Sequence, residues 1–267
     1  MDHSTLKEVT PDGALLLISQ FDRVTSYSKG AKLWGLFKGM PEDVVGLLKP
    51  IGYFKYFPNI QMSSKPPESM SIVEHTTGRT IDPRAADSII TEFKKSNSID
   101  DVGGKRLGKC LIECMENVSK HAYDYPVERR LLKKWWMIGY RDTLTGELSF
   151  VFLDQGIGMP KKLRFSRADQ LIDFFGLNNL FGVSDEELII AAFLRPMSST
   201  KKSNRGLGLT GLKRYLDRGQ KGELLVQSHS SRVLLKPGAR PTGMLTKKKL
   251  EGTMLLWKFL PRKQVQI

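Results

Sequence analysis

The sequence has 267 residues, of which 40% are hydrophobic and 26% charged, an ordinary composition for a globular protein with a substantial core. No apolar run approaches the ~18 residues of a membrane-spanning helix, and the first residues lack the pattern of a secretory signal, so we expect no membrane insertion. The formal net charge of +14 makes nucleic acid a candidate partner, although the charge is dispersed along the chain.

The first 80 residues form an N-terminal accessory segment whose role the sequence does not define. A short helix is predicted at 41–50, where a proline and an acidic turn begin an apolar run. The aromatic run 52–57 is interpreted as a strand, and the alternating run 68–75 predicts another.

Residues 81–267 are predicted to form one domain. Cys110 and Cys114 lie four residues apart, which implies no disulfide framework and favours a reduced, cytoplasmic setting. The basic stretch 236–252 is interpreted as a loop. Helices interspersed with hairpins predict an α/β (α+β) two-layer sandwich, with helices on one face of a mixed, mainly antiparallel sheet. The periodicity predicts helices at 84–96, 105–123, 188–194 and 208–219, and strands at 133–142, 146–154, 222–228, 232–235 and 252–260.

A carboxylate and an amide share one face of the long helix predicted at 105–123. Glu113 and Asn117 lie four residues apart, so their side chains point the same way. The carboxylate can orient or deprotonate a water molecule, and the amide oxygen can bind a hard cation such as magnesium. Taken alone, such a pair usually forms a solvated helix face.

An acid and two glycines follow the apolar strand that ends at Leu153. Asp154 occupies the strand end, and Gly156 and Gly158 come next. Glycines permit backbone angles that are closed to other residues and let a flat ligand approach, while the carboxylate can accept a hydrogen bond from an exocyclic amine. A simple Asp-Gly turn is the alternative interpretation.

A third pattern precedes the helix predicted at 208–219. Gly206 and Gly208 leave backbone N–H groups free to hold phosphate oxygens at the helix start. Neither the Walker loop nor the dinucleotide-binding fingerprint is present. A glycine-rich helix start without a ligand is the alternative.

In this order, the three patterns and a Gly-Thr pair in the last strand resemble the motifs of the GHKL ATPases, the superfamily of gyrase-like, Hsp90-like, histidine-kinase-like and MutL-like proteins. The matching segments are Glu113 to Asn117, Asp154 to Gly158, Gly206 to Leu209, and Gly252-Thr253. The resemblance covers roughly residues 85–262. It implies a Bergerat-type ATP-binding fold with ATP and Mg²⁺ as cofactors.

The resemblance also implies roles for individual residues. Glu113 would be the general base, and Asn117 would ligate the magnesium ion. Asp154 would bind the adenine amino group, with Thr253 supporting it. The other residues that it places around the nucleotide are Gly156, Gly158, Met159, Lys201, Gly206, Leu207, Gly208 and Leu209.

The segment 159–205 corresponds to the ATP lid of this superfamily. It is long for a simple connection. Its end is polar and basic, so that Lys201 could reach the terminal phosphate when the lid closes. Solvated lysines are the alternative.

The carboxylate at Glu113 separates this chain from sensor histidine kinases, which usually carry Asn there, and no phosphoacceptor histidine is evident. We therefore favour an ATP-hydrolysing switch whose lid closure is read by a protein partner. An anti-sigma-type protein serine/threonine kinase is one alternative. A non-catalytic ATP-binding regulatory module with a basic nucleic-acid- or protein-binding surface is another. By resemblance, the chain could form a homodimer.

Overall fold

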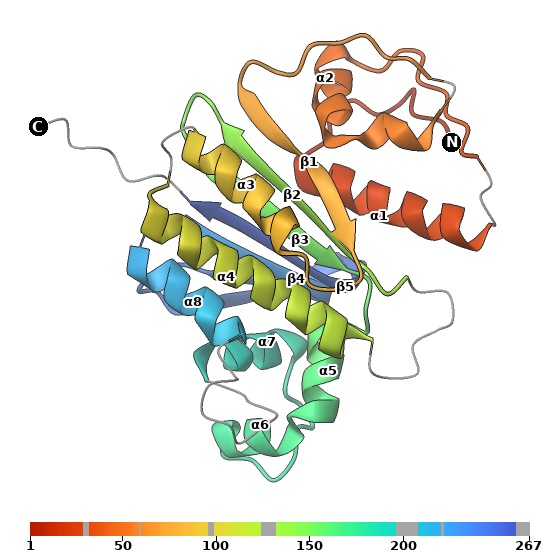
Figure 1. Cartoon of the computed structure of the whole chain (residues 1–267). Helices are drawn as coiled ribbons and strands as arrows, with labels where there is room; N and C mark the ends of the chain where they lie inside the picture. Colours follow the sequence, from red (N-terminus) through yellow and green to blue (C-terminus); the bar gives the residue numbers. More distant parts are fainter. Residues whose placement is uncertain are drawn as a thin grey trace, which may run out of the picture.

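The computed structural model describes residues 1–28, 32–58, 60–95, 99–123, 132–195, 208–219 and 222–259. Its centre is a five-stranded sheet with the strand order β1-β2-β3-β5-β4 (Figure 1). All four pairings are antiparallel, so the sheet is not mixed within these residues, and short connections join β2 to β3 and β4 to β5 as hairpins. The strands are β1 (Met70–Gly78), β2 (Trp135–Asp142), β3 (Leu148–Asp154), β4 (Gly222–Leu235) and β5 (Thr242–Phe259).

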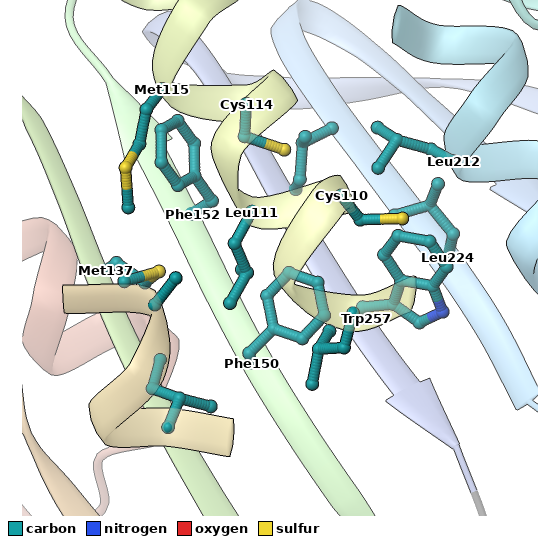
Figure 2. Packing of buried hydrophobic residues seen from close by; sticks show 14 of the residues in the cluster. Cys110, Leu111, Cys114, Met115, Met137, Phe150, Phe152, Leu212, Leu224 and Trp257 are labelled. Carbon is teal, nitrogen blue, oxygen red and sulfur yellow. The ribbon is translucent and has the colours of Figure 1, made fainter. Parts of the chain in front are cut away.

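One face of the sheet is covered by α3 (Pro83–Lys95), α4 (Asp101–Asn117) and α8 (Gly208–Gly219) (Figure 1). We call it the α4 face. Alternate strand residues project into this layer, and Figure 2 shows Leu111 of α4 packed with Phe150 of β3 and Trp257 of β5. The helices predicted for these three segments are confirmed.

The opposite face, here the α1 face, is covered by α1 (Pro11–Tyr27) and α2 (Glu42–Ile51) (Figure 1). The intervening strand residues, among them Trp136 and Val151, pack against these helices. The prediction of helices on one face is therefore wrong, and the molecule has three layers. The physical reason is that β2 and β3 are apolar at consecutive positions, so both of their faces have to be buried.

A third group of helices lies at one end of the sheet: α5 (Met159–Ser166), α6 (Ala168–Phe175) and α7 (Asp185–Leu194) (Figure 1). They pack around a small core of their own. A capping box begins α7: the Ser184 side chain accepts from the Glu187 backbone N–H, and the Glu187 carboxylate accepts from the Ser184 backbone N–H. Most of the segment interpreted as a lid is thus helical, and 196–205 lie outside the described residues.

Two local predictions are wrong. The aromatic run at 52–57 is not a strand: Gly52 ends α2 in the left-handed region at φ 91°, and Tyr53–Tyr56 form a 3-10 helix, η1, with Tyr53 buried against α1. The stretch 236–252 is mostly strand rather than loop, because β5 begins at Thr242 and pairs with β4.

The boundary predicted at residue 80 falls directly after β1, which pairs with β2.

No helix in the described part of the chain is long and apolar enough to cross a membrane.

Candidate functional site

Asp154 ends β3 at a buried position opposite Thr253 of β5. The Asp154 side chain is on the α4 face, and the residue is 7% exposed. Burial raises the pKa of this carboxyl to about 7, although backbone N–H groups of Gly156 and Thr253 donate to it and favour its charged form. The sheet register therefore brings together two predicted site residues that lie far apart in the sequence.

The glycines around Asp154 are required by close packing of the backbone. A Cβ atom on Gly156 would lie 2.4 Å from the carbonyl oxygen of Ala122. Gly158 and Gly252 both have positive φ, 82° and 86°, and a Cβ atom on Gly252 would lie 2.0 Å from the carbonyl oxygen of Asp154. Substitution at any of the three would displace the loop that follows β3.

Ser228 and His229 of β4 hold the other side of this loop, and the sequence analysis did not identify them. The Ser228 hydroxyl accepts from the backbone N–H of Met159 at 2.9 Å and donates to the carbonyl oxygen of Gly252 at 2.7 Å. His229 has φ 52°, and its Nε2 lies 2.9 Å from the carbonyl oxygen of Ile157. No sequence pattern marks these residues, because a β-bulge places them here.

Glu113 lies half-buried on α4, where it faces the first turn of α8. A Cβ atom on Gly211 would be 2.8 Å from Oε2 of Glu113, so the absence of a side chain at Gly211 lets the carboxylate reach α8. Burial raises the pKa of Glu113 to about 7; the Arg214 guanidinium opposes this shift and Glu116 adds to it. A carboxyl with this pKa is suited to general base chemistry near neutral pH.

The end of α4 is attached to the loop after β3. Asn117 is the last residue of α4, and the π-helix η2 (Val118–Ala122) follows it directly. The carbonyl oxygen of Ala122 accepts from the backbone N–H of Ile157 at 3.1 Å. π-Helical segments are frequent at functional sites. The first two predicted motifs, which are more than 30 residues apart in sequence, are therefore neighbours.

The third motif is only partly described. Gly208 is the first residue of α8, whereas Lys201, Gly206 and Leu207 lie outside the described residues. Leu209 is partly buried between the α4-face core and the small core of α5 to α7, as is Met159. Their packing is that of ordinary core residues.

The described residues contain no group of three or more His, Cys, Asp or Glu side chains that could hold a metal ion. Within the site, Glu113 and Asn117 offer oxygen donors on one side of α4, where a magnesium ion would need further oxygen ligands from phosphate or water. Asn117 as a magnesium ligand stays a prediction.

In comparisons with known proteins, no family model matches the chain, and no curated protein matches it at a significant level.

Proposed function

We propose that this protein binds Mg-ATP between α4, the loop after β3 and the start of α8, and hydrolyses it as a conformational switch that a protein partner reads. The observation that carries the proposal is the buried carboxyl of Asp154 at a strand end, beside Thr253 and a loop whose glycines leave no room for side chains.

Asp154 supplies the recognition of the base. A buried carboxylate accepts a hydrogen bond from the exocyclic amine of adenine, whereas the carbonyl group that guanine has at the same position would face it with a second acceptor. Backbone N–H groups already hold the carboxyl of Asp154 in place. The site therefore favours ATP over GTP.

Glu113 supplies the base for hydrolysis. With a pKa raised to about 7 it is partly ionised at neutral pH, and a carboxylate of this basicity removes a proton from an attacking water more readily than an ordinary one. Asn117, one turn along the same helix, would hold the magnesium ion, which neutralises phosphate charge. The first N–H groups of α8 would donate to phosphate oxygens, because Gly211 in its first turn lies against Glu113.

The test measures inorganic phosphate release from Mg-ATP by the protein and by Glu113→Gln. We expect the variant to release phosphate at least about tenfold more slowly, a loss of ~1.4 kcal/mol of transition-state stabilisation. Its ATP affinity should stay within about threefold, because the base acts on water in the transition state. Glu116→Gln is the matched control: Glu116 lies on the same helix, pairs with Lys120 at 2.9 Å and makes the smallest of the three contributions to the pKa of Glu113, so phosphate release should change by less than about twofold.

The remaining outcomes separate the alternatives. ATP binding without phosphate release by either protein would contradict hydrolysis and favour the non-catalytic module. Transfer of the labelled γ-phosphate to a protein substrate would favour the kinase. Failure of the unaltered protein to bind ATP would overturn the nucleotide site itself.

A further inference from the structure

The β4–β5 hairpin contains a long β-bulge that includes three lysines. His229 of β4 pairs with Leu250 of β5, and Ser231 pairs with Leu245. Four residues of β5, Thr246–Lys249, therefore lie opposite one residue of β4. We call them the lysine bulge. The Thr246 hydroxyl bonds to the carbonyl oxygen of Lys248 at 2.7 Å, which holds the bulge in a defined shape.

The bulge directs its charges into solvent beside the candidate nucleotide site. Lys247, Lys248 and Lys249 are all exposed. Lys249 directly precedes Leu250, the β5 partner of His229, and Lys161 follows the segment Gly158–Met159 that lies against His229 and Ser228. Burial lowers the pKa of His229, and the charges of Lys249 and Lys161 lower it further, whereas the hydrogen bond to Ile157 and the charge of Asp185 raise it. Lys161 is an exposed residue of α5. Residues from two elements thus form one basic surface around His229.

Acidic groups neutralise only part of this surface: Oδ2 of Asp185 lies 4.0 Å from Nδ1 of His229, and Lys236 pairs with Glu223 at 3.9 Å. The segment 232–250 has six basic residues and no Asp or Glu. Nearby acids have other partners, since Glu251 pairs with Arg23 at 2.7 Å and Asp185 pairs with Arg164 at 3.2 Å. Counting the described residues alone, the three bulge lysines form no ion pair within 4.0 Å. Their charge is available to an external anion.

We propose that the lysine bulge, together with Lys161 and the hairpin turn that carries Lys236 and Arg240, binds the phosphodiester backbone of nucleic acid. Lysine ammonium groups act as point charges toward phosphates and do not distinguish bases, so the binding is independent of sequence. The net charge of +14 attracts a polyanion over a longer range. A membrane surface fits less well, because segments that lie in the bilayer interface are amphipathic helices, whereas 232–250 is a β-hairpin that contains no Trp, Tyr or Phe and exposes only Met244 and Leu245 as large apolar side chains.

The test measures the affinity of the whole protein for a short fluorescein-labelled DNA duplex by fluorescence anisotropy, between about 50 and 200 mM salt. The variant replaces Lys247, Lys248 and Lys249 with Ala. Each phosphate contact contributes about 0.9 to the slope of log affinity against log salt, so losing three contacts should reduce the slope by about 2.7. At 100 mM salt the affinity should fall about tenfold or more.

The control replaces Lys7, Lys32 and Lys38 with Ala. These lysines are exposed near the N-terminus, and their replacement removes the same total charge as the bulge variant. The control should therefore lose less than about twofold in affinity. Equal losses in the two variants would overturn the proposal, because dispersed charge would then explain the binding. Binding to anionic phospholipid vesicles but not to DNA would overturn it in favour of a membrane. Phosphate release without added DNA reports separately on the ATPase.

Discussion

Carboxyl groups on the two faces of the sheet have different surroundings. On the α1 face, Asp22 accepts hydrogen bonds from Tyr56 at 3.0 Å, Lys134 at 3.3 Å and the indole N–H of Trp136 at 2.8 Å. On the α4 face, burial raises the pKa values of Asp154 and Glu113 to about 7.

This difference indicates which carboxyl groups stabilise the fold and which are suited to bind or react with a ligand. A carboxylate with three donors, one of them a cation, is held in one position and joins α1 to the sheet. A carboxyl whose pKa lies near 7 can change its protonation or exchange partners at little cost. The α1 face therefore serves stability, and the α4 face is the one on which we propose the nucleotide site.

Two adjacent tryptophans give the largest effect that tests this comparison. Trp135 and Trp136 are both fully buried on opposite faces, and their indole N–H groups donate to the Thr80 carbonyl oxygen and to Asp22 respectively. We expect Trp136→Phe to cost about 3 kcal/mol of unfolding free energy and Trp135→Phe about 2 kcal/mol, because the first also removes a donor from a charged acceptor. Urea unfolding of both variants measures this. An equal or reversed order would contradict the structural role of Asp22.

The pH dependence of the unfolding free energy tests the α4 face, with a smaller expected effect than the tryptophan substitutions. The folded pKa of Asp154, about 7, lies above its ordinary value of 3.8, so its stability contribution is present below pH 4 and is lost as the pH rises through 7. Relative to Asp154→Asn, the unfolding free energy of the unaltered protein should fall by on the order of 2 kcal/mol between pH 5 and 8. Urea unfolding of both proteins at the two pH values measures it. A difference that does not vary with pH would show that the carboxyl is ionised at little cost.

The smallest expected effect concerns the ion pair between Arg23 of α1 and Glu251 of β5. The pair is partly exposed, so Arg23→Ala should change the unfolding free energy by less than about 1 kcal/mol, and added salt should reduce the effect further. Thermal unfolding at two salt concentrations measures it. A larger loss would mean that α1 is held by charge rather than by its apolar face.

The fold was predictable where one segment's own pattern determines its structure. The periodicity of 84–96 and 105–123 and the apolar runs of β2 and β3 predicted the α4 layer and the central strands correctly. The helix α1 was missed, although Thr10 caps it and Pro11 begins it, two start signals visible in the sequence. The third layer was missed as well, although the consecutive apolar residues of β2 and β3 indicate strands that are buried on both faces. Which helices cover the second face depends on packing between distant segments, which no local pattern encodes.

Candidate site residues could be named from the sequence, whereas their geometry and their neighbours Ser228 and His229 could not. The motif order placed Asp154, Thr253 and Glu113 in one site, and the structure pairs the first two across β3 and β5. Glu113 instead faces Gly211, a contact between helices about 100 residues apart. The left-handed backbone of His229 and the lysine bulge arise from strand register, which no local pattern in the sequence encodes.

The packing of α1 against β5 has a consequence for folding. Arg23 and Glu251 are separated by 228 residues, and Met254 of β5 belongs to the same core as Leu15 of α1. At the usual rate of synthesis, α1 emerges on the order of tens of seconds before its partner strand exists. Its apolar side stays without its final cover during that time, and the late closure of so long a loop slows folding. We therefore expect the nascent chain, more than the finished protein, to need protection against aggregation.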